Sequence, residues 1–591
     1  MGCAREATVS REPSRAGRCE GGRGAVSGWD WLIVAVFNGG IILAGLWVAR
    51  GTRSSFEWFL ASRTLPWWAI GLSMFATNVD SADLVGVTAM TFREGVHVVT
   101  VYALGSAVGA FLAAWVVVPQ IVRAGCFTNA EYLEWRYGPS TRVLSALIQI
   151  QYRTSLLGAM IWSTYQALLE LVGLSAVGAW VVIVGLVVAA AVYTSWGGLK
   201  SVVWTDAGQG VVMIIAAAVV FTAVWDQVGG WKALEAKLHA QDVQAGTHLA
   251  SLLHVGGYHG DRGRLAAGWI VLGWTIIGAG YWTVNHTQTM RLMGARSLRD
   301  MQYGAVFGVL LSLPVMLVAA SLGVFCHGMD GLPELDPDRL FPYLANHVLR
   351  PGLKGLVVAG MVAALVSTFD SMGSALSAVF TRDVYARFIA SNRSESHYVL
   401  ISRVSTVGIL LLGFAYVPFI ARQDHMLRAF VTLIPVFVTP LLTVYVAGVT
   451  TKVSRRSGLV GLLSGGAYGV LALIDRQFVD WPWFPAWLSE RWVAIAWSVL
   501  FTLVPMAVAT LIQRHAGRNR TARQPAVAER VSDVTDRARA AADAAASDWL
   551  SRTSIPAMAV GDESLGGVWG PRLAAAVMFA LCVWVNFGLL W

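Results

Sequence analysis

The sequence predicts an all-α membrane protein with about fourteen transmembrane helices. Of its 591 residues, 56% are hydrophobic and only 13% are charged, whereas a soluble domain carries about a quarter charged residues. Fourteen runs approach the roughly 20 apolar residues that a helix needs to cross a bilayer. A net charge of +9 would also fit a nucleic-acid-binding protein. The basic residues lie between the apolar runs, however, so we expect a lipid bilayer and no nucleic acid as the partner.

The first apolar run is longer than a signal peptide and lacks a small-residue cleavage site, so we expect it to stay as a helix. Five cysteines are scattered without metal-ligand spacing, and we expect no metal beyond the cation sites considered below. The fourteen predicted spans lie near residues 28–50, 65–92, 95–123, 142–172, 176–194, 202–225, 266–290, 302–327, 352–380, 398–421, 427–450, 457–474, 491–513 and 572–591.

Arginine and lysine concentrate in one set of alternate loops, such as those with Arg123, Lys200 and Arg382. The positive-inside rule makes these loops cytoplasmic and turns both termini outward. Five arginines in the N-terminal tail conflict with this orientation, and the thirteen later spans outweigh them. The sequence therefore predicts a multi-pass protein of the cell (inner or plasma) membrane.

Polar residues interrupt the second predicted span between Thr77 and Asp83. Two half-helices that flank a polar break leave backbone carbonyls free to bind a cation, and irregular backbone survives in a membrane only beside protein or water. The alternative is a straight helix whose Asp80 and Asp83 face a water-filled cavity.

The ninth predicted span carries Ser367, Ser371 and Ser374 at positions i, i+4 and i+7, so the three hydroxyls share one helix face. Asp370 lies one turn from Ser367. Hydroxyl and carboxylate oxygens are hard ligands that suit hard cations. Serines also join membrane helices by hydrogen bonds, and composition alone leaves both interpretations open. Asp370 favours a cation site because a carboxylate inside a membrane is costly.

Several motifs follow one another in the order found in one transporter family. They include Phe75–Asn78, Thr128–Leu133, Gly197–Asp206 with Gln209, Tyr281 and Trp282 with Asn285 and Arg291, and Ala364–Tyr385. In these motifs the chain resembles the sodium:solute symporter family, which includes the sodium/glucose, sodium/proline and sodium/sialic acid cotransporters. The resemblance covers roughly residues 28–475.

The resemblance implies a LeuT-type fold, in which two inverted five-helix repeats contain discontinuous helices. Gly278 and Gly280 precede a polar stretch in the counterpart of the broken second span. The expected divisions are a 1–27 tail, a 28–50 leading helix, a first repeat at 65–229, a second at 265–450, two further helices at 457–513, a cytoplasmic Arg/Ala-rich linker at 514–571 and a last helix at 572–591.

The resemblance also implies sites for sodium as the coupling ion, with no other cofactor. The main site would use three backbone carbonyls and two hydroxyls, from Ala76, Val79, Ala364, Ser367 and Thr368. A second candidate site would combine Asp206 with Ser367, Asp370 and Ser371. Asp370 replaces the hydroxyl that the family usually has there, which would strengthen a cation site or make it protonatable.

The candidate solute pocket departs from the sugar-transporter pattern. Ala82 and Asp83 stand where sugar transporters have polar or acidic residues, Tyr102 replaces a glutamate, and Leu311 replaces a lysine. Asp80 and Asp83 would suit a solute with a cationic or hydroxyl-rich group. The residues expected to line the pocket are Asn78, Asp80, Asp83, Tyr102, Tyr281, Trp282 and Asn285.

The expected function is sodium-coupled symport of a small organic solute, sugar-like or otherwise polar, into the cell by alternating access. A proton-coupled transporter that uses Asp370 or Asp206 is the main alternative, and a solute sensor on the same fold is another. No enzyme is expected, because the sequence has no metalloprotease, nucleophile-elbow or phosphate-loop motif.

Overall fold

The computed structural model describes residues 26–49, 55–257, 263–329, 331–333, 335–422, 426–479, 481–515 and 565–591. Most of the predicted N-terminal tail and of the 514–571 linker lies outside these residues. The described residues form helices and, apart from one isolated bridge between Leu65 and Ala295, no β-structure. Within the described residues, eleven helices are long and apolar enough to cross a membrane. An all-helical membrane protein is therefore confirmed, and the count of fourteen spans stays a prediction.

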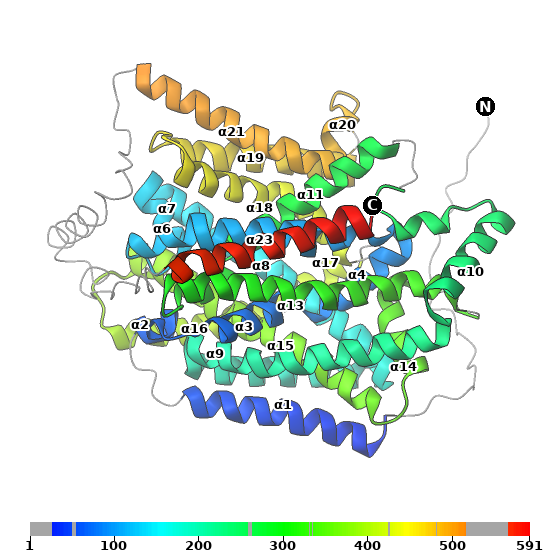
Figure 1. Ribbon diagram of the computed structural model, residues 1–591. Helices are drawn as coiled ribbons and strands as arrows, with labels where there is room; N and C mark the ends of the chain where they lie inside the picture. The colour runs from blue at the N-terminus through cyan, green and yellow to red at the C-terminus, as the bar shows by residue number, and fades with distance from the viewer. Residues whose placement is uncertain are drawn as a thin grey trace, which may run out of the picture.

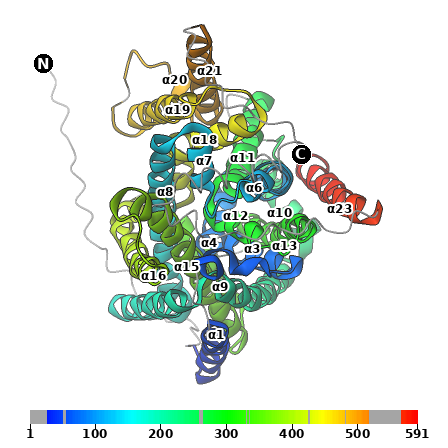
Figure 2. The ribbon, with the colours of Figure 1, turned by 90° about the vertical axis from the view of Figure 1, so that its left-hand side faces the viewer.

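The long helices lie side by side with roughly parallel axes (Figures 1 and 2). α1 (Gly28–Ala49) lies at one end of the molecule, and α19 (Ser457–Ile474) and α21 (Arg491–His515) lie at the other. The long helices between them include α8 (Pro139–Ala167), α13 (Leu298–Phe325), α15 (Leu353–Val379), α16 (Glu395–Leu412) and α18 (Met426–Thr450). Two more, α9 (Ala176–Val228) and α11 (Gly263–Val284), are described below, and α23 (Leu565–Trp584) packs along α13.

Shorter segments join and cover these helices. Between α4 (Ser81–Glu94) and α7 (Asn129–Tyr137), the chain runs as consecutive helical turns from Val101 to Arg123. This stretch includes α5 (Ser106–Phe111) and α6 (Val118–Arg123). Further short helices are α2 (Ser55–Leu60), α7 (Asn129–Tyr137), α10 (Gly230–Ala245), α14 (Leu340–Val348), α17 (Val417–Ile420) and α20 (Ala486–Ser489).

The second predicted span is broken, as the sequence suggested. α3 (Trp67–Asn78) ends at Val79, and α4 (Ser81–Glu94) begins after Asp80; both linking residues have extended backbone. Asp80 Oδ1 accepts a hydrogen bond of 2.9 Å from the Asp83 backbone N–H, and Asp83 Oδ2 accepts one of 3.2 Å from the Asp80 N–H. This reciprocal cap favours a new helix start at Asp80 over continuation of α3. It leaves carbonyls at the end of α3 without helical partners.

A second break separates α11 (Gly263–Val284) from α12 (His286–Met293) at Asn285, whose side chain caps α12 by accepting from the Thr287 N–H. Gly278 and Gly280 precede this break by one to two turns. Gly278 serves close packing, since a Cβ there would lie 2.6 Å from the Cα of Gly105. The two broken helices fit the expected fold, while its division into two five-helix repeats stays a prediction.

α9 (Ala176–Val228) spans 53 residues. A straight helix of this length, at about 1.5 Å per residue, would be about 80 Å long, more than twice the thickness of a bilayer core. Gly198 interrupts it with φ 58° and ψ −167°, a conformation that only glycine adopts readily. The kink falls between the predicted spans 176–194 and 202–225.

Candidate functional site

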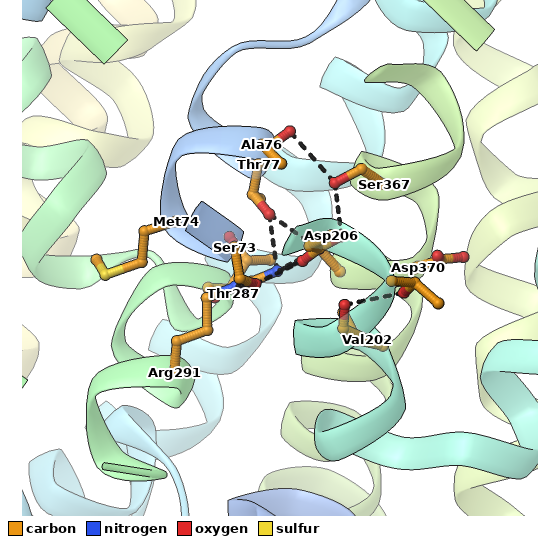
Figure 3. A network of polar contacts seen from close by, with 12 residues as sticks. Ser73, Met74, Ala76, Thr77, Val202, Asp206, Thr287, Arg291, Ser367 and Asp370 are labelled. Carbon is orange, nitrogen blue, oxygen red and sulfur yellow. Dashed lines mark hydrogen bonds and ion pairs between the residues drawn. The ribbon is translucent and has the colours of Figure 1, made fainter. Parts of the chain in front are cut away.

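The first part of the candidate site is a buried polar network where α3, α9, α12 and α15 meet (Figure 3). Ser367 on α15 donates to Asp206 Oδ1 on α9 at 2.6 Å, and its Oγ lies 3.2 Å from the carbonyl oxygen of Ala76. Ala76 lies in the last turn of α3. The hydroxyl of α15 is thereby placed against a carbonyl of the broken helix.

Four of the five residues expected to bind sodium form two pairs, and the fifth, Val79, lies apart from them. Ala76 and Ser367 are in direct contact, while the Thr368 hydroxyl donates to the Ala364 carbonyl at 3.1 Å within α15. Val79 forms the extended link after α3, and no hydrogen bond joins it to α15 in the described part of the chain. Carbonyl and hydroxyl oxygens are the ligands that hard cations prefer.

Arg291 contacts two of the residues expected to bind a second cation, Asp206 and Ser371. From α12, its Nη2 donates to Asp206 Oδ2 at 2.8 Å and to Thr77 Oγ1 at 2.7 Å, and it also donates to Ser371. Its Nε donates to Ser73 Oγ at 2.5 Å. The Arg291 and Asp206 side chains are both fully buried. The structure thus brings Asp206 and Ser371 together around a guanidinium group, which supplies the balancing positive charge.

Asp370 does not join this network. Its Oδ1 accepts a hydrogen bond of 2.8 Å from Thr194, on the part of α9 before the kink. Its Oδ2 is buried without a hydrogen-bond partner among the described residues. Figure 3 shows Asp370 on the far side of Asp206 from Arg291. Helical spacing placed Asp370 one turn from Ser367, but Ser367 meets the part of α9 after the kink and Asp370 meets the part before it.

The second part of the candidate site is a cavity beside the break in α3 and α4, with about 690 Å³ of empty space that is partly open to solvent. Six of the seven residues expected to contact a solute line it, namely Asn78, Asp80, Asp83, Tyr102, Tyr281 and Trp282. Ala82 is also in its wall. The remaining wall is mainly aliphatic and aromatic.

Hydrogen bonds fix the polar walls of this cavity. The Tyr281 hydroxyl donates to the carbonyl oxygen of Thr77 at 2.7 Å, so α11 contacts the end of α3 directly. The Tyr102 hydroxyl donates to Asp83 Oδ1 at 2.6 Å. Trp282 Nε1 donates to Ser106 Oγ at 3.0 Å. These contacts hold three aromatic rings in place around the break.

Asn285 is not in the cavity wall, because its side chain caps α12. Two residues that sequence reasoning did not assign lie at the cavity. Trp274 is in the wall and donates to His97 Nδ1 at 2.9 Å. It precedes Tyr281 by seven residues, and this two-turn spacing on one helix face could have identified it. Arg153 lies 5.2 Å from the Tyr281 ring centre, and no sequence signal placed it there.

The comparisons with known proteins agree with this geometry. The profile of the sodium:solute symporter family matches residues 58–465. The sodium/myo-inositol cotransporter 2 of Rattus norvegicus is 27% identical over 75% of this chain and 70% of its own length. The sodium/glucose cotransporter of Vibrio parahaemolyticus is 24% identical over 82% of this chain and 90% of its own. A solved structure of a Na⁺-coupled sialic acid symporter has the same fold, with a TM-score of 0.69, 16% identity, and coverage of 82% of this chain and 98% of that one.

The chain belongs to the sodium:solute symporter family. It is an integral, multi-pass membrane protein of a family whose members are transporters rather than enzymes. The family and its relatives support sodium-coupled symport of a solute, with sodium as the coupling ion.

Proposed function

We propose that this protein carries a small polar organic solute into the cell together with sodium, by alternating access, and that it resides in the plasma or inner membrane. The observation that carries the proposal is the contact between Ser367 and the Ala76 carbonyl. It joins the intact helix α15 to the broken helix at a place where oxygens from both are available. The relatives named for glucose and myo-inositol support a hydroxyl-bearing solute.

The sodium site would be formed by Ala76, Val79, Ala364, Ser367 and Thr368. A cation there would bridge α15 and the end of α3. The solute cavity shares the same break, because Tyr281 in its wall donates to the Thr77 carbonyl. Sodium binding and solute binding would therefore stabilise the same arrangement of the broken helix. By thermodynamic reciprocity, each ligand would raise the affinity for the other.

The contacts of Arg291 bear on how many sodium ions the protein binds. Its guanidinium already neutralises Asp206 and bonds to Ser371, so the candidate second site is filled by the protein's own cation in this conformation. We therefore assign the coupling ion to the first site.

Thermal unfolding of the purified protein with NaCl or KCl at equal ionic strength tests the sodium site without a known solute. Sodium should raise the Tm of the natural chain, since a ligand at about 100 times its Kd adds about 2.7 kcal/mol of stability. The double variant Ser367→Ala, Thr368→Ala should lose the sodium-dependent rise. Ser377→Ala, which removes a buried hydroxyl bonded only to Ser374 on the same helix, is the control and should keep it.

Retention of the sodium effect in the double variant would contradict the proposed site. Absence of any sodium effect in the natural chain would contradict sodium coupling itself and favour the proton-coupled alternative, which uptake driven by a pH gradient would then test.

A further inference from the structure

We infer that the solute is an organic cation, bound with its positive group at Asp80 and with a neighbouring hydrogen-bonding group at Asn78. The inference deepens the proposed function and rests on it for the place of binding, namely the cavity beside the break in α3 and α4.

The hydrogen bonds of the two cavity carboxylates leave one oxygen free. Both oxygens of Asp83 are used, one by the Tyr102 hydroxyl and one by the Asp80 backbone N–H. Oδ1 of Asp80 accepts from the Asp83 N–H, and the Ala82 N–H adds a weaker contact to the same carboxyl group. No closer hydrogen bond reaches Oδ2 among the described residues. Asp80 is 4% exposed and lines the cavity. Its free oxygen is therefore available only to an occupant of the cavity.

The helix cap does not require this charge. An N-cap needs a side-chain oxygen, which asparagine or serine supplies about as well as aspartate. Asp80 and Asp83 together bring two carboxyl groups to a cavity inside the membrane, where their ionised forms are costly unless they are balanced.

The protein supplies less positive charge near the cavity than the ionised carboxyl groups of Asp80 and Asp83 would need for balance. The N-terminus of α4 contributes roughly half a positive charge. The nearest cation is Arg153, which is 1% exposed. It lies 5.8 Å from the ring centre of Tyr152 and 5.2 Å from that of Tyr281, and none of its side-chain nitrogens has a hydrogen-bond partner in the described part of the chain. It makes no direct ion pair with either aspartate in the described part of the chain, but its charge acts on both. With both carboxyl groups ionised, a net negative charge remains for the solute to balance.

The other walls suit a cation as well. The rings of Trp274, Tyr281 and Trp282 line the cavity, and aromatic faces attract ammonium groups within about 6 Å of the ring centre. Asn78 is 6% exposed, and its Nδ2 donor has no partner among the described residues. This unpaired donor in the cavity wall would bind a hydroxyl or carbonyl oxygen of the solute.

Matched pairs of probes test the charge directly. Choline and 3,3-dimethyl-1-butanol have nearly the same shape and differ in charge, and glucosamine differs from glucose by an ammonium in place of a hydroxyl. The Tm of the purified full chain is measured in saturating NaCl against the concentration of each probe. We expect at least one cation to raise Tm and its neutral partner to do so at least about tenfold more weakly.

The variant Asp80→Asn keeps the capping oxygen and removes the charge. We expect it to weaken binding of the cation by at least about tenfold and to reduce the difference between cation and neutral partner. Asp80→Ser is a second capping variant with the same expectation, and Asp242→Asn, outside the cavity, is the control and should bind as the natural chain does.

The inference is overturned if neutral partners bind as well as the cations, if no cation in the set raises Tm, or if Asp80→Asn binds cations as before. Sodium stabilisation without any solute is measured in the same preparations. If it persists while a neutral probe binds best, only the charge of the solute is wrong; if it is absent, the proposed function fails.

Discussion

Arg291 places a fully buried positive charge at the centre of the polar network, bonded to Asp206, Thr77, Ser73 and Ser371. Its contacts reach α3, α9 and α15 from α12. A lone charge at this depth would be strongly unfavourable, and the pair is stable because each member satisfies the other.

Arg291→Gln should destabilise the protein by about 3–5 kcal/mol, because it leaves the Asp206 carboxylate buried without a cation. The double variant Arg291→Gln, Asp206→Asn should recover part of this loss, because neither charge then remains unpaired. Unfolding of both variants in detergent measures the difference. Equal stability of Arg291→Gln and the natural chain, or strictly additive losses in the double variant, would contradict the assigned role of the pair.

At the scale of helices, the crossing of α11 over the turn at Gly105 depends on glycine. A Cβ at Gly278 would lie 2.6 Å from the Gly105 Cα and 2.7 Å from the Val101 carbonyl oxygen. This close approach brings Trp274, Tyr281 and Trp282 of α11 to the cavity opposite Tyr102.

Gly278→Ala should lower stability by about 1–3 kcal/mol, the usual cost of overpacking a core, and should weaken any ligand of the cavity by moving α11. Gly268→Ala, on the exposed face of the same helix with no atom within 4 Å of the new Cβ, is the control. It should be neutral or slightly stabilising, because alanine favours helix over glycine. Tm values of the two variants test this, and a Gly278→Ala variant as stable as Gly268→Ala would show that close packing does not require glycine at position 278.

At the scale of the molecule, Glu134 connects segments that are far apart in the chain. It accepts hydrogen bonds from Arg142 at 2.7 Å and from Arg387 at 2.8 Å. These residues belong to α7, to the start of α8 and to the turns that follow α15. Burial raises the pKa of Glu134, but the two guanidinium groups lower it by more, so its pKa lies below the ordinary value. The ionised form is therefore stabilised in the folded protein.

A lowered pKa contributes stability above the unfolded pKa of about 4.3, and this contribution is lost as pH falls through the folded value. Glu134→Gln should therefore be less stable than the natural chain at pH 7, by about 1.5–3 kcal/mol for hydrogen bonds to charged groups. The gap should close below pH of about 4. Tm measured from pH 7 downward tests this, with Glu235→Gln on the exposed face of α10 as control. A gap that is constant with pH would show that the carboxylate charge is not involved.

The break in the second span could be predicted because its cause is local. Asn78, Asp80 and Asp83 compete with the helix for backbone hydrogen bonds wherever they occur in a chain, and the structure has the break at Val79 and Asp80. The hydroxyl face of α15 followed from helical spacing in the same way. The position of the break after α11 was predicted less accurately. Gly278 and Gly280 indicated a break, whereas the structure has it at Asn285, which caps α12.

Neither the ion-pair partner of Asp206 nor the hydrogen-bond partner of Asp370 could be predicted. Arg291 is 85 residues from Asp206 in the sequence, and it reaches Asp206 only because α12 starts anew at Asn285. Asp370 and Ser371 are neighbours on one helix, yet one meets Thr194 and the other Arg291. Which helix faces each side chain depends on packing between segments distant in sequence.

The sequence by itself determined that this is a multi-pass helical membrane protein of the sodium:solute symporter family, with a broken helix near residue 79 and a buried hydroxyl face at Ser367. Those features rest on apolar length, local capping chemistry and motif order, all of which are written in short stretches of the chain. Only the tertiary structure decided that Arg291 pairs with Asp206 and that Asp80 lies in the wall of the cavity. Both depend on which side chains several helices bring together, and no local pattern specifies that.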